Sequence, residues 1–263
     1  MSSTWLALEI GNSRLHWALF QGEELCSTWD TPHLAASVVQ QLAECQNFAD
    51  LSKDLLSHPS FEQIGCLRYP CPIYLASVVP SQTALWQAYH DVCVITLEQV
   101  PLQGVYPTLG IDRALALWGA GVTWGFPVLT IDAGTALTFT GANADRRLVG
   151  GAILPGLSLQ LQSLGQTASL PLVEEQNVLS LPQRWALNTP EAIASGVIYT
   201  QIAGIRDFIE AWWQEFPGSC ICLKGGDANL LLTHMRSLFP SVASKVIADP
   251  HLIFWGMRSC WRI

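Results

Sequence analysis

Two short segments place a carboxylate, a glycine and a hydroxyl side chain where one expected strand turns into the next. They are Glu9-Ile10-Gly11-Asn12-Ser13 and Asp132-Ala133-Gly134-Thr135-Ala136. In such a corner the glycine lets the backbone approach a ligand, N–H and hydroxyl groups donate to phosphate oxygens, and the carboxylate binds a cation or water. Ordinary hairpin turns use the same residue types. Both interpretations stay open at this point, a nucleotide phosphate site and a pair of plain turns.

A third segment, Gly110-Ile111-Asp112-Arg113, lies where a loop is expected to enter a helix. Aspartate is a good N-cap residue, and from spacing alone capping is the favoured role for Asp112. The alternative makes Asp112 a general base facing a cleft, with Arg113 offering a forked donor to a carboxylate or phosphate.

A fourth segment, Lys224-Gly225-Gly226-Asp227, lies at an expected strand-to-helix turn. Its amides fit either an anion site at a helix N-terminus or a plain turn. The sequence contains no G-x-x-x-x-G-K-[ST], no G-x-S-x-G and no H-E-x-x-H, and no G-x-G-x-x-G follows a strand. P-loop, serine-elbow and zincin chemistry are therefore excluded.

The composition bounds the class of protein. The chain has 263 residues, half of them hydrophobic and 13% charged, with a formal charge of −8. At about 150 residues per domain, this length corresponds to roughly two domains or to one large one. An acidic chain is poorly suited to bind nucleic-acid phosphates. The low charge and the 11 tryptophans favour self-association. Eight scattered cysteines predict reduced thiols in a cytoplasmic protein without a zinc site. The uncharged run 114–131 is split by glycines and Pro127, so we expect buried core there and no membrane span.

The first half of the chain is expected to open with three strands and then to alternate helices and strands. The strands are expected over 4–10, 14–20 and 25–31, a helix over about 33–45, a strand over 73–79, a helix over 81–90, a strand over 92–98, a loop over 99–110, and a helix from near Asp112.

The second half repeats this order. It is expected to contain a strand–turn–strand over 127–142, a strand over 147–154, a short helix after Gly156, a polar loop over 165–187, a long helix from a Thr189 cap, a strand over 221–226, a helix over 227–239, a strand over 246–248 and a C-terminal helix. The repeat predicts two α/β domains of like topology, 1–117 and 118–263, with a cleft between them.

Taken together, these segments resemble the type III pantothenate kinases, within the acetate and sugar kinase/Hsp70/actin superfamily. That family's patterns D-x-G-N-[ST], G-x-D-R, D-x-G-T-A, G-G-x-I-x-P-G and N-T correspond in order to residues 9–13, 110–113, 132–136, 150–156 and 188–189. The first pattern is changed by Glu9, which carries the carboxylate outward by about 1.5 Å, one C–C bond. His16 also stands where relatives often have lysine, and Tyr106 lies nearer to G-x-D-R than the family's substrate-contacting tyrosine does.

The resemblance implies two ribonuclease H-like (actin-like ATPase) domains that phosphorylate pantothenate with ATP and Mg²⁺, giving 4′-phosphopantothenate, the first step of coenzyme A synthesis. It further implies a cytoplasmic homodimer with no nucleic-acid or membrane partner. Asp112 is then the base. The substrate contacts implied are Tyr106, Gly110, Ile111, Asp112, Arg113 and Thr189. The ATP contacts implied are Glu9, Ile10, Gly11, Asn12, Ser13, Arg14, Leu15, His16 and Thr135. Asp132 would hold a monovalent cation, K⁺ or NH₄⁺.

Two rival functions remain. One is another small-molecule kinase of the same superfamily, acting on a sugar or an acid. The other is a regulatory relative that kept the fold and lost catalysis, which Glu9 alone favours.

Overall fold

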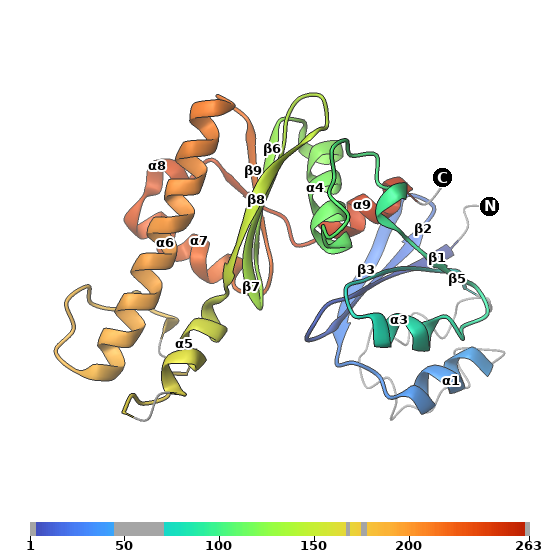
Figure 1. Cartoon of the computed structure of the whole chain (residues 1–263), viewed down its shortest axis with the longest axis horizontal. Coiled ribbons are helices and arrows are strands. Elements are labelled where there is room, and N and C mark those ends of the chain that lie inside the picture. The colour runs from blue at the N-terminus through green and yellow to red at the C-terminus, as the bar shows by residue number, and fades with distance from the viewer. Residues whose placement is uncertain (1–3, 45–70, 167–168, 175–177, 261–263) are drawn as a thin grey trace. The chain divides into compact units, whose positions relative to one another are not determined.

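The computed structural model describes residues 4–44, 71–166, 169–174 and 178–260 (Figure 1). The expected end of a helix at residue 45 and parts of the expected loop 165–187 lie outside these ranges. The chain divides into two compact units, which are described separately. Unit 1 comprises 1–101, 106–119 and 253–263, and unit 2 comprises 102–105 and 120–252. The boundary between residues 117 and 118 stays a prediction, and these units differ from it in where 102–105, 118–119 and 253–263 belong.

Unit 1 is built on a five-stranded mixed sheet in the order β3-β2-β1-β4-β5. Strands β1 to β3 are antiparallel neighbours, and β4 and β5 run parallel to β1. Its elements are β1 (Thr4–Ile10), β2 (Leu15–Gln21), β3 (Glu24–Thr31), α1 (Ala36–Glu44), β4 (Ile73–Ser77), α3 (Pro80–Trp86), β5 (Val92–Val94), the 3₁₀ turn η2 (Leu97–Gln99), the first part of α4 (Ile111–Trp124) and most of α9 (Leu252–Cys260).

Unit 2 repeats this arrangement, with a sheet in the order β10-β9-β6-β7-β8. Here β6 to β8 are antiparallel, and β9 and β10 run parallel to β6. Its elements are the end of α4, β6 (Val128–Ala133), β7 (Ala136–Ala142), β8 (Leu148–Pro155), α5 (Leu157–Gly165), α6 (Thr189–Glu215), β9 (Cys220–Lys224), α7 (Ala228–Leu238), α8 (Pro240–Ala243) and β10 (Val246–Ala248). The predicted α/β class with two domains of like topology is confirmed.

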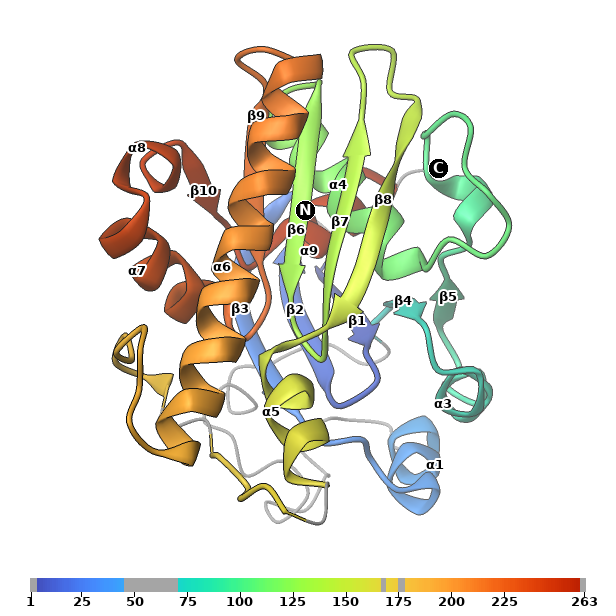
Figure 2. The same cartoon turned by 60° about the vertical axis from the view of Figure 1, so that its left-hand side comes forward.

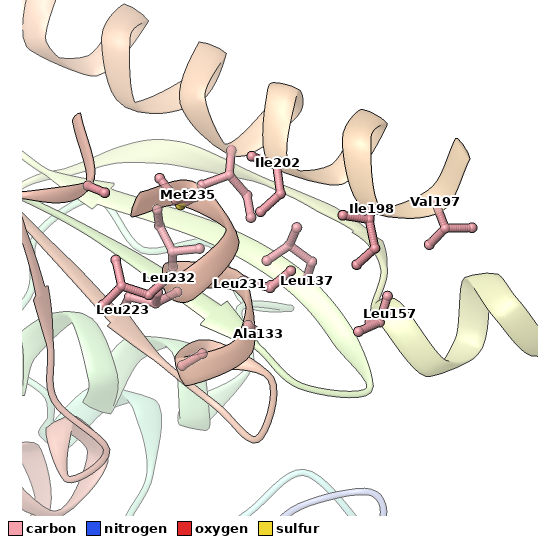
Figure 3. Close-up of a cluster of buried hydrophobic side chains, with 14 of the residues drawn as sticks. Ala133, Leu137, Leu157, Val197, Ile198, Ile202, Leu223, Leu231, Leu232 and Met235 are labelled. Atoms are coloured by element: carbon pink, nitrogen blue, oxygen red, sulfur yellow. The ribbon is translucent and has the colours of Figure 1, made fainter. Parts of the chain in front are cut away.

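Each sheet buries one face against its own helices. In unit 2, α6 runs along the sheet (Figure 2), and Figure 3 shows Leu137 of β7 among side chains of α5, α6 and α7. In unit 1, Leu6 and Leu8 of β1 join Trp17 and Trp86 in the corresponding cluster. Since successive strand residues point to opposite faces, Glu9 and Asp132 lie on the faces turned away from these clusters.

Two predicted elements of unit 1 are shorter than expected. The predicted helix over 81–90 ends at Trp86, because Tyr89 turns inward and its hydroxyl donates to the carbonyl of Cys71 at 3.1 Å. The predicted strand over 92–98 ends at Val94, because Thr96 and Gln99 form a capping box that starts a 3₁₀ turn.

The uncharged run 114–131 is divided as predicted. Helix α4 ends at Trp124, Gly125 has φ of 97°, and β6 begins at Val128. In the parts of the chain that the structure describes, there is no helix of sufficient length and hydropathy to cross a bilayer.

Candidate active site

The first corner joins β1 to β2 in unit 1. Glu9 is the next-to-last residue of β1, pairs with His16 across the ladder and is only 9% exposed. The turn closes through Gly11, whose N–H donates to the carbonyl of Arg14 at 3.0 Å. Asn12, Ser13 and Arg14 are exposed at its tip. The corner thus presents exposed donors beside a buried carboxylate.

Two histidines support this corner. The Nδ1 atom of His16 lies 2.7 Å from Oδ1 of Asp30, its partner on β3. The Nε2 atom of His33 lies 2.9 Å from the carbonyl oxygen of Gly11 and therefore holds the turn from outside. Sequence reasoning missed His33, because it lies 22 residues beyond Gly11 and no local spacing signals the contact.

The segment Gly110-Ile111-Asp112-Arg113, called the base loop after the role expected of Asp112, enters α4 at Gly110. The carbonyl of Gly110 accepts the first helical hydrogen bond, from the N–H of Ala114 at 3.0 Å, so Gly110 caps the helix and Asp112 is its second residue. The favoured expectation that Asp112 is the N-cap is therefore wrong. The carboxylate of Asp112 instead folds back, accepts from the N–H of Arg113 at 2.8 Å, and occupies the place that a Cβ on Gly110 would need.

Arg113 links this loop to Tyr106. Its Nη1 donates to the tyrosine hydroxyl at 3.1 Å, and the Tyr106 side chain is 40% exposed. A guanidinium and a phenol that share a hydrogen bond form a donor pair suited to an anionic or hydroxyl-bearing substrate. The structure thus places the Tyr106 hydroxyl beside Arg113 of the base loop.

The base loop lies near the strand that neighbours β1. Parallel pairing continues past the end of β4, where the N–H of Val78 donates to the carbonyl of Ile10 at 3.2 Å. A Cβ on Gly110 would lie 3.9 Å from Cγ1 of Val78. The carboxyl ends of neighbouring parallel strands are the usual ligand-binding edge of an α/β sheet. Within unit 1, the first corner and the base loop therefore occupy the same edge.

The second corner joins β6 to β7 in unit 2. The N–H of Gly134 donates to the carbonyl of Ala136 at 3.1 Å, and Thr135 is exposed at the tip. Gly156 packs beneath, where its N–H donates to the carbonyl of Thr135 at 2.9 Å and a Cβ would overlap the carbonyl of Gly134. This contact explains why a glycine stands directly before α5.

The turn after β9 packs against the same corner. Nζ of Lys224 lies 2.8 Å from Oδ2 of Asp132, and the N–H of Asp227 donates to the carbonyl of Ala133 at 2.9 Å. Gly225 has φ of 101°, and a Cβ there would lie 2.7 Å from Oδ1 of Asp132. Sequence reasoning singled out Lys224 but missed its pairing with Asp132, which depends on β9 lying beside β6.

Thr189 lies at the start of α6, on a different element from the second corner. The predicted cap at Thr189 is wrong by one residue, because the side chain of Asn188 accepts from the N–H of Glu191 at 3.0 Å. Pro190 follows within the first turn. Asn188 therefore performs the capping, and the exposed Thr189 side chain begins the helix itself.

Comparison with known proteins identifies relatives along most of the chain. The family model for "Type III pantothenate kinase" matches residues 5–211, which include both corners, the base loop and Thr189. A type III pantothenate kinase of Nostoc sp. is 57% identical over 98% of this chain and 95% of its own length. A type III pantothenate kinase of Synechocystis sp. is 42% identical, over 97% and 89%.

Solved structures show the same fold at low identity. A Baf family protein from Campylobacter jejuni matches with a TM-score of 0.63 and 19% identity, covering 98% of this chain and 97% of its own. The activator of 2-hydroxyisocaproyl-CoA dehydratase from Clostridium difficile, solved with bound ADPNP, matches with a TM-score of 0.54 and 9% identity, covering 98% and 93%.

Proposed function

The chain belongs to the type III pantothenate kinase family, and from this we propose its function. It transfers the γ-phosphoryl group of ATP to pantothenate and yields 4′-phosphopantothenate, the first step of coenzyme A biosynthesis. The observation that carries this function is the match to the family over residues 5–211 together with 57% identity to a relative across 98% of the chain. All five sequence patterns fall within that match.

We propose that the first corner and Thr135 bind the phosphates of ATP, which arrives with Mg²⁺. The contacts assigned are Glu9, Ile10, Gly11, Asn12, Ser13, Arg14, Leu15, His16 and Thr135. The exposed tip of the corner and its fixed Gly11 turn support this assignment, because phosphoryl transfer depends on preorganised donors at the charged oxygens. Mg²⁺, when bound with ATP, neutralises part of the phosphate charge.

We assign the proton-accepting role to Asp112. In the transfer, the 4′-hydroxyl oxygen of pantothenate bonds to the γ-phosphorus, the bond from that phosphorus to the β–γ bridging oxygen breaks, and ADP leaves. The hydroxyl proton passes to the Asp112 carboxylate late in the step. The hydrogen bond from the N–H of Arg113 supports this role, since it fixes one carboxylate oxygen and orients the other.

Pantothenate carries a carboxylate and hydroxyl groups, and we assign Tyr106, Gly110, Ile111, Arg113 and Thr189 to its recognition. Arg113 and Tyr106 already share a hydrogen bond, so their donors are positioned before substrate binds. The forked guanidinium suits a carboxylate better than a lysine ammonium would.

The resemblance to the family implies a monovalent cation at Asp132. The described residues do not offer it as a bare ligand, because the ammonium of Lys224 lies 2.8 Å from Oδ2. A free potassium or ammonium ion therefore does not fit these residues as they stand, and no catalytic step is assigned to one.

We also propose that the protein works as a cytoplasmic homodimer without nucleic-acid or membrane partners, with 1–117 and 118–263 as its functional halves. Large apolar side chains exposed on unit 2 support self-association, since covering them with a second copy would remove apolar area from water. They include Ile153 at 65% exposure, Trp185 at 85% and Leu187 at 99%. The free thiols of the described cysteines are in keeping with a reducing compartment.

An ADP-release assay with ATP and one acceptor at a time tests the function against its rivals. We expect pantothenate alone to raise the rate above the ATP-only background. A comparable rise with glucose or acetate would favour another kinase of the superfamily, and no rise with any acceptor would favour a relative without catalysis. The second and third results each contradict the proposal.

A further inference from the structure

The ion pair between Lys224 and Asp132 is set by the sheet of unit 2. Strands β6 and β9 are parallel neighbours, and Asp132 and Lys224 are paired residues in their register. Side chains at paired positions of neighbouring strands leave the sheet on the same face. The 2.8 Å contact between Nζ and Oδ2 therefore follows from strand order, and no chance meeting of surface side chains is needed to explain it.

Both partners of this pair are largely withdrawn from solvent. The side chain of Lys224 is 10% exposed and that of Asp132 is 24% exposed. Burying an ammonium without an opposite charge costs far more than burying it beside a carboxylate, and losing one partner of a buried pair is strongly destabilising. The ammonium of Lys224 therefore places one positive charge beside the Asp132 carboxylate whenever unit 2 is folded.

The turn after Lys224 encloses the pair. Gly225 takes a positive φ of 101°, and the space that its Cβ would fill lies 2.7 Å from Oδ1 of Asp132. Asp227 then ties the turn to the second corner through its N–H bond to Ala133. Lys224 is thus anchored on both sides, by its strand and by the turn that covers the carboxylate.

We propose that the ammonium of Lys224 takes the place of the monovalent cation at Asp132, so that this chain works without potassium or ammonium ions. A lysine ammonium carries the same charge as either ion and donates hydrogen bonds as a free ammonium ion does. Because it is tethered, its occupancy does not depend on the salt concentration. The inference rests on the role that the family resemblance implies for Asp132, but it does not depend on the identity of the phosphate acceptor.

The first test measures thermal unfolding of the full chain in KCl and in tetramethylammonium chloride at equal ionic strength. Tetramethylammonium is too bulky to enter a potassium site and controls for screening. Wild-type protein should unfold at the same midpoint in both salts. Lys224→Met should unfold at a lower midpoint, which rises with KCl concentration and does not rise with tetramethylammonium, because an ion that binds only the folded state stabilises it.

The second test measures turnover in the same salts. Wild-type turnover should agree within about twofold between them, whereas Lys224→Met should lose roughly tenfold or more and regain activity in KCl or NH₄Cl, an effect within the range of an electrostatic contact in a transferase. Lys245→Met is the matched control. Lys245 lies 5.2 Å from the ring centre of Trp213, away from Asp132, so its salt response should equal that of wild type.

A specific rise in wild-type midpoint or turnover with K⁺ would overturn the inference, and that comparison needs no variant that folds poorly. A Lys224→Met protein that folds and ignores K⁺ in both tests would overturn it as well. If no acceptor is phosphorylated in any salt, the proposed function fails on its own, while the midpoints still decide whether Lys224 replaces the ion.

Discussion

The carboxylate of Asp112 is held by its own helix, since the N–H of Arg113 donates to Oδ1 and Gly110 leaves room for the fold-back. If Asp112 is the base, as we propose, a carboxylate positioned in this way needs no large rearrangement before it accepts a proton. General-base catalysis contributes a factor of about 10²–10⁴ in rate. The consequence for Asp112 can be measured directly.

Asp112→Asn should lower kcat by about 10²–10⁴ with folding intact, because the amide keeps the shape and cannot accept the proton. Steady-state ADP release and circular dichroism check both parts. Asp145→Asn, at an exposed turn of unit 2, makes the same chemical change and should keep wild-type turnover. Wild-type turnover in Asp112→Asn would remove this residue from the role.

His33→Ala should weaken ATP binding, because the carbonyl of Gly11 loses the contact that holds the first corner. We expect KM for ATP to rise several-fold while KM for pantothenate stays constant, since the contact touches the first corner, which we propose binds ATP. His33→Gln, which retains a side-chain donor, should recover part of the loss. An equal rise in both KM values would indicate a general structural defect instead.

At this scale the sequence predicted the local features and missed the distant ones. Glu9, Asp132 and Thr135 lie in corners that a few consecutive residues define, so residue types and spacing were sufficient to predict a strand–turn–strand at each position. The contacts of His33 with Gly11 and of Lys224 with Asp132 depend on segments 22 and 92 positions apart, which only the folded strands bring together.

At the scale of elements, strand order explains where the two acidic residues of the candidate site lie. Each unit places its acidic residue next to last on its first strand, beside a second parallel strand that ends at the same edge. The sequence predicted these strands, because residues 4–10 and the first part of 127–142 are largely apolar runs that end at turn residues. The early ends of α3 and β5 were not predictable, since they depend on the inward turn of Tyr89 and on the capping box at Thr96.

Gly225→Ala should disrupt the turn that covers Asp132. A side chain there meets a positive φ of 101° and the carbonyl of Ala133, so we expect a loss of about 1–3 kcal/mol in the free energy of unfolding and a large fall in turnover. Urea unfolding and ADP release measure these effects. The neighbouring Gly226→Ala is the control, because a Cβ there has nothing within 4 Å. Equal stability of the two variants would contradict this account of the turn.

At the scale of the whole molecule, the chain forms two five-stranded sheets of the same topology, and its C-terminal segment then belongs to unit 1 again. Helix α9, last of the described elements, packs on unit 1, where Gly256 lies so close to Leu115 that a Cβ would overlap its carbonyl. The repeat was visible in the sequence because both halves open with similar strand–turn–strand segments. The assignment of residues 253–263 to unit 1 was not predictable, since the sequence of an apolar helix does not indicate which of two sheets it packs against.

Buried thiols are expected to limit the stability of the folded protein at alkaline pH. Burial raises the pKa of Cys71 and Cys222 to about 12, with smaller contributions from Asp91 at Cys71 and from Cys220 and Asp249 at Cys222. An unfolded thiol ionises near pH 9.0, so the folded state holds the proton more tightly. The associated stability is complete below that pH and is lost as pH rises towards 12.

The free energy of unfolding, measured with urea, should therefore fall as pH rises from about 9 towards 12, by at most about 1.4 kcal/mol per pH unit for each thiol. Cys222→Ala should make this fall smaller, although the variant is less stable throughout. Cys26→Ala, at an exposed thiol, should leave the fall unchanged. An identical fall in wild type and Cys222→Ala would assign the alkaline limit to other groups.

Mass spectrometry of the reaction product is the most direct measurement of the central claim, that this chain phosphorylates pantothenate. The purified protein is incubated with ATP, Mg²⁺ and pantothenate in a buffer without potassium. The account predicts 4′-phosphopantothenate formed in equal amount to ADP. ADP released without a phosphorylated pantothenate, or no ADP at all in this buffer and in one supplied with potassium, would contradict it.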